Sequence, residues 1–160
     1  MMLRLGLVSL FVVTGTSDVK ADANADKDGP KILAQGTAHG KHGSRVLRSH
    51  KEAMAAYGLK EGNAATALIA KMLKVDKIDW DKQMVVLVSG GVQRTGGFSV
   101  KVEKLTVADK TLTVHWKLNA PKPGSIVTQA LTHPGAIALL DRFEGEVRFD
   151  PAPPKGKLER

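Results

Sequence analysis

The stretch FSVKVEKLTVADKTLTVHWKL, residues 98–118, contains two runs in which apolar and polar residues alternate. Alternation with a period of two places one face of a strand in a core and the other in water. The alternation changes phase near Lys104, which predicts a β-bulge, and residues 108–110 (ADK) are typical of a turn. The stretch therefore predicts an antiparallel hairpin with one buried and one solvated face.

Shorter apolar runs on both sides of this hairpin predict further strands. Residues 84–88 (MVVLV) are apolar without interruption, which is typical of a strand buried on both faces. Residues 136–140 (AIALL) and 147–149 (VRF) follow the hairpin as two more strand candidates. Nearer the start of the chain, residues 31–35 and 46–47 are candidates for short strands.

Two short helices are predicted before residue 75. Ser49 and Glu52 have the spacing of a capping box, so a helix at 51–57 is expected to end at Gly58. Apolar residues recur at helical spacing through 63–74, which predicts a second helix. We therefore predict an α+β fold: two short helices followed by a mostly antiparallel β-sheet or a small sandwich or half-barrel.

The N-terminal segment has the features of a secretory signal peptide. Arg4 precedes an apolar run of nine residues, 5–13, which is too short for a bilayer because a spanning helix needs about 20 residues. Small residues follow, so a signal peptidase could cleave after Ala21 or after Ala23, and the bounds below use Ala23. We therefore expect a secreted or periplasmic protein with no transmembrane segment after signal cleavage. The predicted organisation is a signal peptide at 1–23, a flexible leader at 24–30, a single domain at 31–150 and a Pro-rich basic tail at 151–160.

The composition limits the classes of function. The sequence contains no cysteine, which excludes disulfides, cysteine-ligated zinc and thiol catalysis. Lys and Arg number 24 against 16 Asp and Glu, a formal charge of +8, but the basic residues are dispersed and aromatic residues make up only 4%. We therefore predict no nucleic-acid partner. A polyanion-binding protein remains an alternative, because the net charge permits it.

Few residues suggest catalysis or metal binding. Residues 36–43 (GTAHGKHG) predict a glycine-rich loop in which His39 and His42, with His50 as a third ligand, could hold a metal ion. Neither an H-E-x-x-H nor a G-x-S-x-G motif is present in the sequence, and His133 has no neighbouring nucleophile. We predict a non-enzymatic protein with no catalytic residues, no cofactor and no metal. A hydrolase or metal-binding protein that uses these histidines is the alternative from another class.

Two loops are unusual in composition. Residues 89–98 (SGGVQRTGGF) place four glycines between two strong strand candidates, and glycine allows close backbone approach. Residues 121–134 (PKPGSIVTQALTHP) combine turn residues with apolar ones. Loops of this kind are frequent binding sites on a rigid scaffold. The same glycines are equally compatible with a purely structural turn.

The sequence resembles the C-terminal domain of the protease complex subunit PrcB family over about residues 80–149. The resemblance rests on Trp80, the apolar run 84–88, and two motifs in order, RTGGFSV at 94–100 and PKPG…VTQALT…P at 121–134. Phe98 stands where the family usually has Tyr, and Gly135 stands where an aromatic residue often follows the proline.

The resemblance implies an extracytoplasmic, non-catalytic protein-interaction module that stabilises a protease complex, with another extracytoplasmic protein as its partner. Phe98 and Leu131 are the anchors that we expect to be buried in the complex. The residues predicted to contact the partner are Arg94, Thr95, Gly96, Gly97, Phe98, Thr128, Gln129, Leu131, Thr132 and Pro134.

A second interpretation of the same loop is a protease inhibitor. The TGGF sequence at 95–98 is similar to the TTGY loop of chagasin-like cysteine protease inhibitors. This resemblance is short, so the inhibitor is kept as the alternative to the accessory module.

Overall fold

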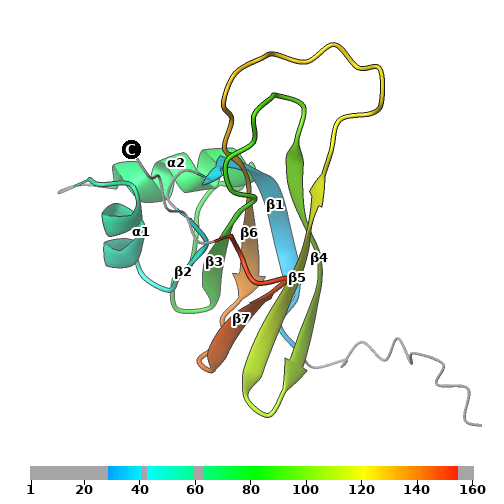
Figure 1. Ribbon diagram of the computed structural model, residues 1–160. Coiled ribbons are helices and arrows are strands. Elements are labelled where there is room, and N and C mark those ends of the chain that lie inside the picture. Colours follow the sequence, from blue (N-terminus) through cyan, green and yellow to red (C-terminus); the bar gives the residue numbers. More distant parts are fainter. Residues whose placement is uncertain (1–28, 41–42, 60–62, 155–160) are drawn as a thin grey trace, which may run out of the picture.

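The computed structural model describes residues 29–40, 43–59 and 63–154. The predicted signal peptide and most of the predicted leader lie outside these residues, and so does His42. The described part contains two helices and seven strands (Figure 1). In chain order they are β1 (Ile32–His39), β2 (Arg45–Leu47), α1 (His50–Ala56), α2 (Ala64–Leu73), β3 (Gln83–Ser89), β4 (Ser99–Ala108), β5 (Thr111–Asn119), β6 (Pro134–Asp141) and β7 (Glu146–Asp150).

The strands form two sheets. The first has the order β1-β6-β3-β2, and all of its neighbouring strands are antiparallel. The second has the order β4-β5-β7, in which β5 pairs antiparallel with β4 and parallel with β7. The prediction of an α+β fold with a mostly antiparallel sheet sandwich is confirmed.

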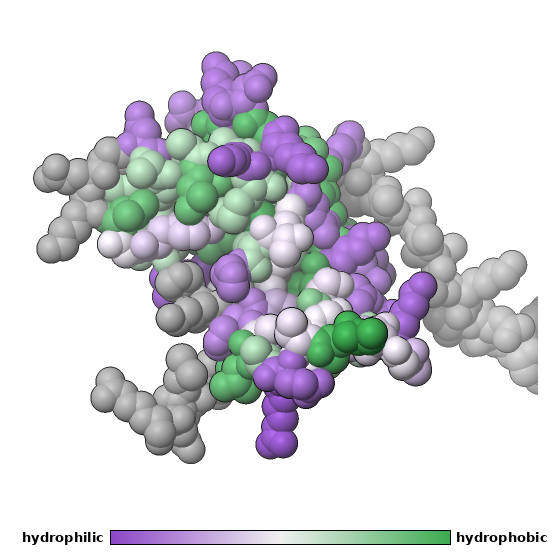
Figure 2. Space-filling model, turned by 90° about the horizontal axis from the view of Figure 1, so that it is seen from above, coloured by the Kyte–Doolittle hydropathy of each residue, from purple (hydrophilic) through white to green (hydrophobic). Residues whose placement is uncertain are grey.

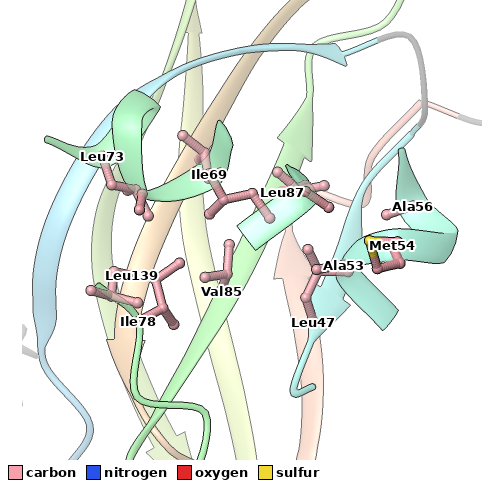
Figure 3. Close-up of a cluster of buried hydrophobic side chains, with 13 residues drawn as sticks. Leu47, Ala53, Met54, Ala56, Ile69, Leu73, Ile78, Val85, Leu87 and Leu139 are labelled. Atoms are coloured by element: carbon pink, nitrogen blue, oxygen red, sulfur yellow. The ribbon is translucent and has the colours of Figure 1, made fainter. Parts of the chain in front are cut away.

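The central strands β3 and β6 of the four-stranded sheet are buried on both faces, as the uninterrupted apolar run at 84–88 predicted for β3. Val85 and Leu87 of β3 point toward the helices, where they meet Ile69 and Leu73 of α2 (Figure 3). Met84, Val86 and Val88 point the other way and form a second core with the three-stranded sheet. Successive residues of one strand therefore belong to different cores, because side chains alternate across a strand.

The predicted hairpin is confirmed in detail. Its strands are β4 and β5, the register shifts between Val102 and Lys104, and Asp109 and Lys110 take positive φ values at the turn. The nitrogen and oxygen of the Gln35 side-chain amide on β1 are assigned from their hydrogen-bond partners. The nitrogen donates to Val102 O (3.0 Å), and the oxygen accepts from Val102 N (3.2 Å). This side chain therefore joins the edge of the first sheet to the edge of the second.

The prediction of a loop at 36–43 is wrong for the first half of that range, because β1 continues to His39. The glycine at position 36 caused the error. A Cβ at Gly36 would collide with the carbonyl oxygen of Met72 in α2, so this glycine allows the helix to pack closely on the strand. The residue therefore marks a close approach between two elements rather than a turn.

Two arginines connect the end of β2 to the β6–β7 connection. Arg48 donates from Nε to Phe143 O (3.1 Å) and from Nη2 to Gly145 O (2.8 Å). Arg142 donates in return to the carbonyl oxygens of Arg48 and Trp80, and its hydrogen bond to Glu144 lowers the pKa of that carboxyl below its ordinary value. These bonds fix the short connection by which the chain passes from the first sheet to the second.

The two cores predict the effect of truncating two consecutive residues of β6. Leu139 is buried on the helix side and Leu140 on the sheet side, so Leu139→Ala and Leu140→Ala should each lower the free energy of unfolding by about 2–5 kcal/mol. Leu68→Ala, at a side chain that is 44% exposed, should change it by less than about 0.5 kcal/mol. Urea denaturation measures all three variants. If either β6 variant matched Leu68→Ala, the division into two cores would be wrong.

Candidate functional site

Two loops lie against each other at one end of the sandwich. Loop 90–98 connects β3 to β4, loop 120–133 connects β5 to β6, and both extend beyond the sheets at the top of Figure 1. Gln93 and Thr132 exchange backbone hydrogen bonds of 2.9 and 2.8 Å, and Gly96 N donates to Thr128 O at 2.9 Å. Thr132 Oγ1 also donates to Thr95 O at 2.8 Å. The two loops are therefore one hydrogen-bonded unit.

Ser89, at the end of β3, connects the bases of both loops to the sheet. It is the buried polar residue of the described part, and its Oγ donates to Gly40 O (2.7 Å) and accepts from Gly91 N (3.2 Å). Gly90 N donates to Pro134 O and Gly40 N to His133 O, both at 2.9 Å. Because backbone groups from β1, β3 and β6 meet here, the loops begin from a fixed base.

The motif glycines are required by the contact between the loops. A Cβ at Gly96 would collide with Thr128 Oγ1, and one at Gly97 would lie 2.8 Å from Pro121 Cβ and 3.0 Å from Val127 Cγ1. Gly97 also has a φ of +83°, which disfavours any other residue. The glycines of the TGGF sequence thus let loop 120–133 cross over loop 90–98.

All ten sequence-predicted contact residues lie on these loops or at Pro134, the first residue of β6. Their exposure differs. Exposed are Arg94, Gly97, Thr128, Gln129 and Leu131; half-buried are Thr95, Phe98, Thr132 and Pro134; Gly96 is buried. The structure therefore brings the two motifs together, and their role in binding a partner stays a prediction.

Val92 and Ile126 were missed as candidates by the sequence reasoning. Ile126 is fully exposed, Leu131 is 68% exposed and Val92 is 45% exposed. These three are half of the large apolar side chains that are exposed in the described residues. Figure 2, which looks down on this end, shows hydrophobic residues among weakly polar ones beside the helical layer. An apolar residue in a turn-rich stretch, as in PGSIV at 123–127, was the signal that could have indicated Ile126.

The charge of the two loops is of one sign. Arg94 and Lys122 are exposed, and neither 90–98 nor 120–133 contains an Asp or a Glu. The chain returns to this end after β7: Trp116 Nε1 donates to Pro151 O (2.7 Å), and a Cβ on Gly91 would lie 2.8 Å from Pro154 Cγ. The end of the molecule is therefore basic and partly apolar, with residues 151–154 beside it.

Other polar clusters have structural partners. Thr106 Oγ1, His115 and Asp150 form a row across β4, β5 and β7, with distances of 2.9 and 3.0 Å to the imidazole nitrogens. His50 Nδ1 lies 2.6 Å from Thr66 Oγ1, which joins α1 to α2. Across residues 29–40, 43–59 and 63–154, no group of three or more His, Asp or Glu side chains could hold a metal ion. In the same residues, neither helix has the length and apolar character to cross a membrane.

These features define the class of protein: a two-sheet sandwich with one helical layer, whose two motif-bearing loops form a single surface at one end. Residues 84–140, from β3 to β6, match the family model described as PrcB C-terminal. The match includes both loops and covers less than half of the 160-residue chain. It confirms the resemblance found in the sequence and suggests a domain associated with a protease complex. No curated protein and no solved structure matches the chain significantly.

Two glycines of this surface provide a matched pair of substitutions. Gly97 and Gly124 both have positive φ, +83° and +81°, but only Gly97 has neighbours within 4 Å of an added Cβ. Gly124→Ala should cost about 1 kcal/mol through backbone strain alone, whereas Gly97→Ala should cost about 2–3 kcal/mol. Urea denaturation measures the difference, and hydrogen exchange should show faster exchange of the Gly96 amide in Gly97→Ala only. Equal costs would mean that the contact between the loops contributes little.

Proposed function

We propose that this protein is a non-catalytic interaction module of the extracytoplasmic space that binds and stabilises a protease complex through its paired loops. The observation that carries the proposal is the exposure of Val92, Ile126 and Leu131 on one hydrogen-bonded unit. Apolar side chains gathered at one end of a molecule are typical of protein-interaction sites. The family match over residues 84–140 supports the protease complex as the partner.

The construction of the loops suits binding by surface complementarity. Loops that are already ordered lose less conformational entropy when a partner binds. Here the cross-loop bonds of Gln93 and Thr132, and the Ser89 network at the base, hold the apolar side chains in place. Ile126 and Leu131 are the most exposed of these apolar side chains, so they are the proposed anchors, in place of the half-buried Phe98.

The proposed location rests on the sequence. The short apolar run at 5–13 after Arg4 is typical of a signal peptide. The absence of cysteine is compatible with an oxidising compartment. A C-terminal tag allows the chain to be purified from each cell fraction, and its mass then gives the cleavage site. A chain that stays in the cytoplasm and keeps Met1 would refute this part of the proposal.

Substitution of the anchors should abolish partner capture without affecting the fold. Ile126→Ser and Leu131→Ser change exposed side chains, so each should alter the free energy of unfolding by less than about 0.5 kcal/mol. Loss of a true anchor should cost about 2 kcal/mol or more of binding, roughly a thirtyfold loss of affinity. The measurement is a pull-down with the tagged full-length chain from the extracytoplasmic fraction, followed by mass spectrometry and titration of the recovered protein.

Leu68→Ser is the matched control, because Leu68 is also an exposed apolar residue, at 44%, and lies on α2 rather than on the loops. A protease recovered with wild type and Leu68→Ser, and lost with both loop variants, would support the proposal. Equal recovery with all four proteins would place the binding surface elsewhere. Inhibition of a papain-like protease by wild type, lost in the loop variants, would replace the stabiliser with the inhibitor.

A further inference from the structure

Two lysines stand directly opposite each other in the second sheet. Lys101 of β4 is the register partner of Lys117 of β5, and both side chains are exposed. Residues in this relation have Cβ atoms about 5 Å apart, and like charges in directly opposite positions destabilise a sheet. The pair therefore costs folding free energy and has no evident structural benefit.

Two other ionisable side chains on this face have acidic partners. Arg148 is paired with Glu146 at 2.8 Å, and His115 Nδ1 lies 3.0 Å from Asp150. In the part of the chain that the structure describes, neither Lys101 nor Lys117 forms an ion pair within 4.0 Å. Glu103, the nearest carboxylate to Lys101 in the sequence, lies at the bulge and forms no ion pair with either lysine within 4.0 Å. Among the register pairs of β4 and β5, Lys101–Lys117 is the one that joins two lysines.

That position lies next to the loops. Two register pairs, Ser99–Asn119 and Val100–Leu118, separate the two lysines from the end of the hairpin that adjoins loops 90–98 and 120–133. Two residues of strand correspond to about 7 Å. With the exposed Arg94 and Lys122, this end carries four cations beside three exposed apolar side chains.

We propose that the partner contributes a protein segment in which carboxylate side chains alternate with apolar ones. Its carboxylates neutralise the Lys101–Lys117 pair, and its apolar side chains cover Ile126 and Leu131. This inference rests on the proposed function and names the chemistry of the partner. A polyanion would neutralise the lysines but would leave the apolar loop residues in water, so the combined surface favours protein.

The proposal predicts opposite effects of one substitution on stability and on binding. Lys117→Glu places a carboxylate opposite Lys101, so the urea midpoint of unfolding should rise while affinity for the acidic segment should fall about tenfold or more. Lys101→Glu should behave in the same way. The double variant restores like charges, so its midpoint should fall back toward that of wild type while binding stays lost.

Lys110→Glu is the control for net charge. Lys110 lies at the turn of the same hairpin, at the end opposite the loops, and the substitution changes the charge of the protein by the same amount. It should change affinity for the acidic segment less than twofold. A charge effect that is equal for Lys110→Glu and Lys117→Glu would overturn the proposal.

The probes are three short labelled peptides used with the full-length chain and measured by fluorescence anisotropy. One alternates Glu with Leu, one alternates Glu with Ser, and one alternates Lys with Leu. Binding of the Glu/Leu peptide alone, lost in Lys101→Glu and Lys117→Glu, is the expected result. Equal binding of the Glu/Ser peptide, or full competition by heparin with no dependence on Ile126, would show a polyanion site and overturn the proposal.

The same variants distinguish this inference from the proposed function. If Lys101→Glu and Lys117→Glu still recovered the native partner while Ile126→Ser did not, the acidic segment would be wrong and the interaction module would stand. If Ile126→Ser recovered it as well as wild type did, the proposed loop surface itself would be wrong.

Discussion

The pairing of β6 between β1 and β3 is the interaction on which the rest of the structure depends. Both faces of these central strands are covered, by helices on one side and by the second sheet on the other. Their backbone groups are shut off from water, so the antiparallel ladders have to satisfy them. Alternate side chains of β3 and β6 then supply two different cores, and the positions of α1, α2 and the β4–β5 hairpin follow from the need to cover them.

The same pairing brings the two loops together. β3 leaves the first sheet at Ser89 and β6 enters it at Pro134, beside each other. The next residue, Gly90, packs against Val100 near the beginning of β4 and Leu118 near the end of β5. Loops 90–98 and 120–133 therefore start and finish beside each other, although the whole β4–β5 hairpin, residues 99–119, separates them along the chain. The glycines at 96 and 97 then allow direct contact, so scaffold and surface are parts of one arrangement.

Much of the scaffold could be predicted from the sequence because local patterns determine it: the alternation at 98–118, the bulge near Lys104 and the helix cap at Ser49 all depend on near neighbours. Contacts between distant segments could not be predicted in this way. Gly36 was interpreted as part of a loop because its neighbour Met72 lies in a helix far along the chain. Val92 and Ile126 are absent from the predicted contact residues because exposure depends on the tertiary fold, and the Lys101–Lys117 pair emerges only from the register of β4 against β5.

The position of β6 in the chain has a consequence for the order of folding. β1 is an edge strand whose neighbour in the sheet is β6, and the two are separated by about 100 residues. β1 therefore cannot pair until β6, which is near the C-terminal end of the domain, has been synthesised. Pairing across so long a separation requires closure of a large loop and is slow. The nascent chain therefore cannot complete either core until residue 141 has emerged, and folding is delayed until synthesis of the domain is nearly finished.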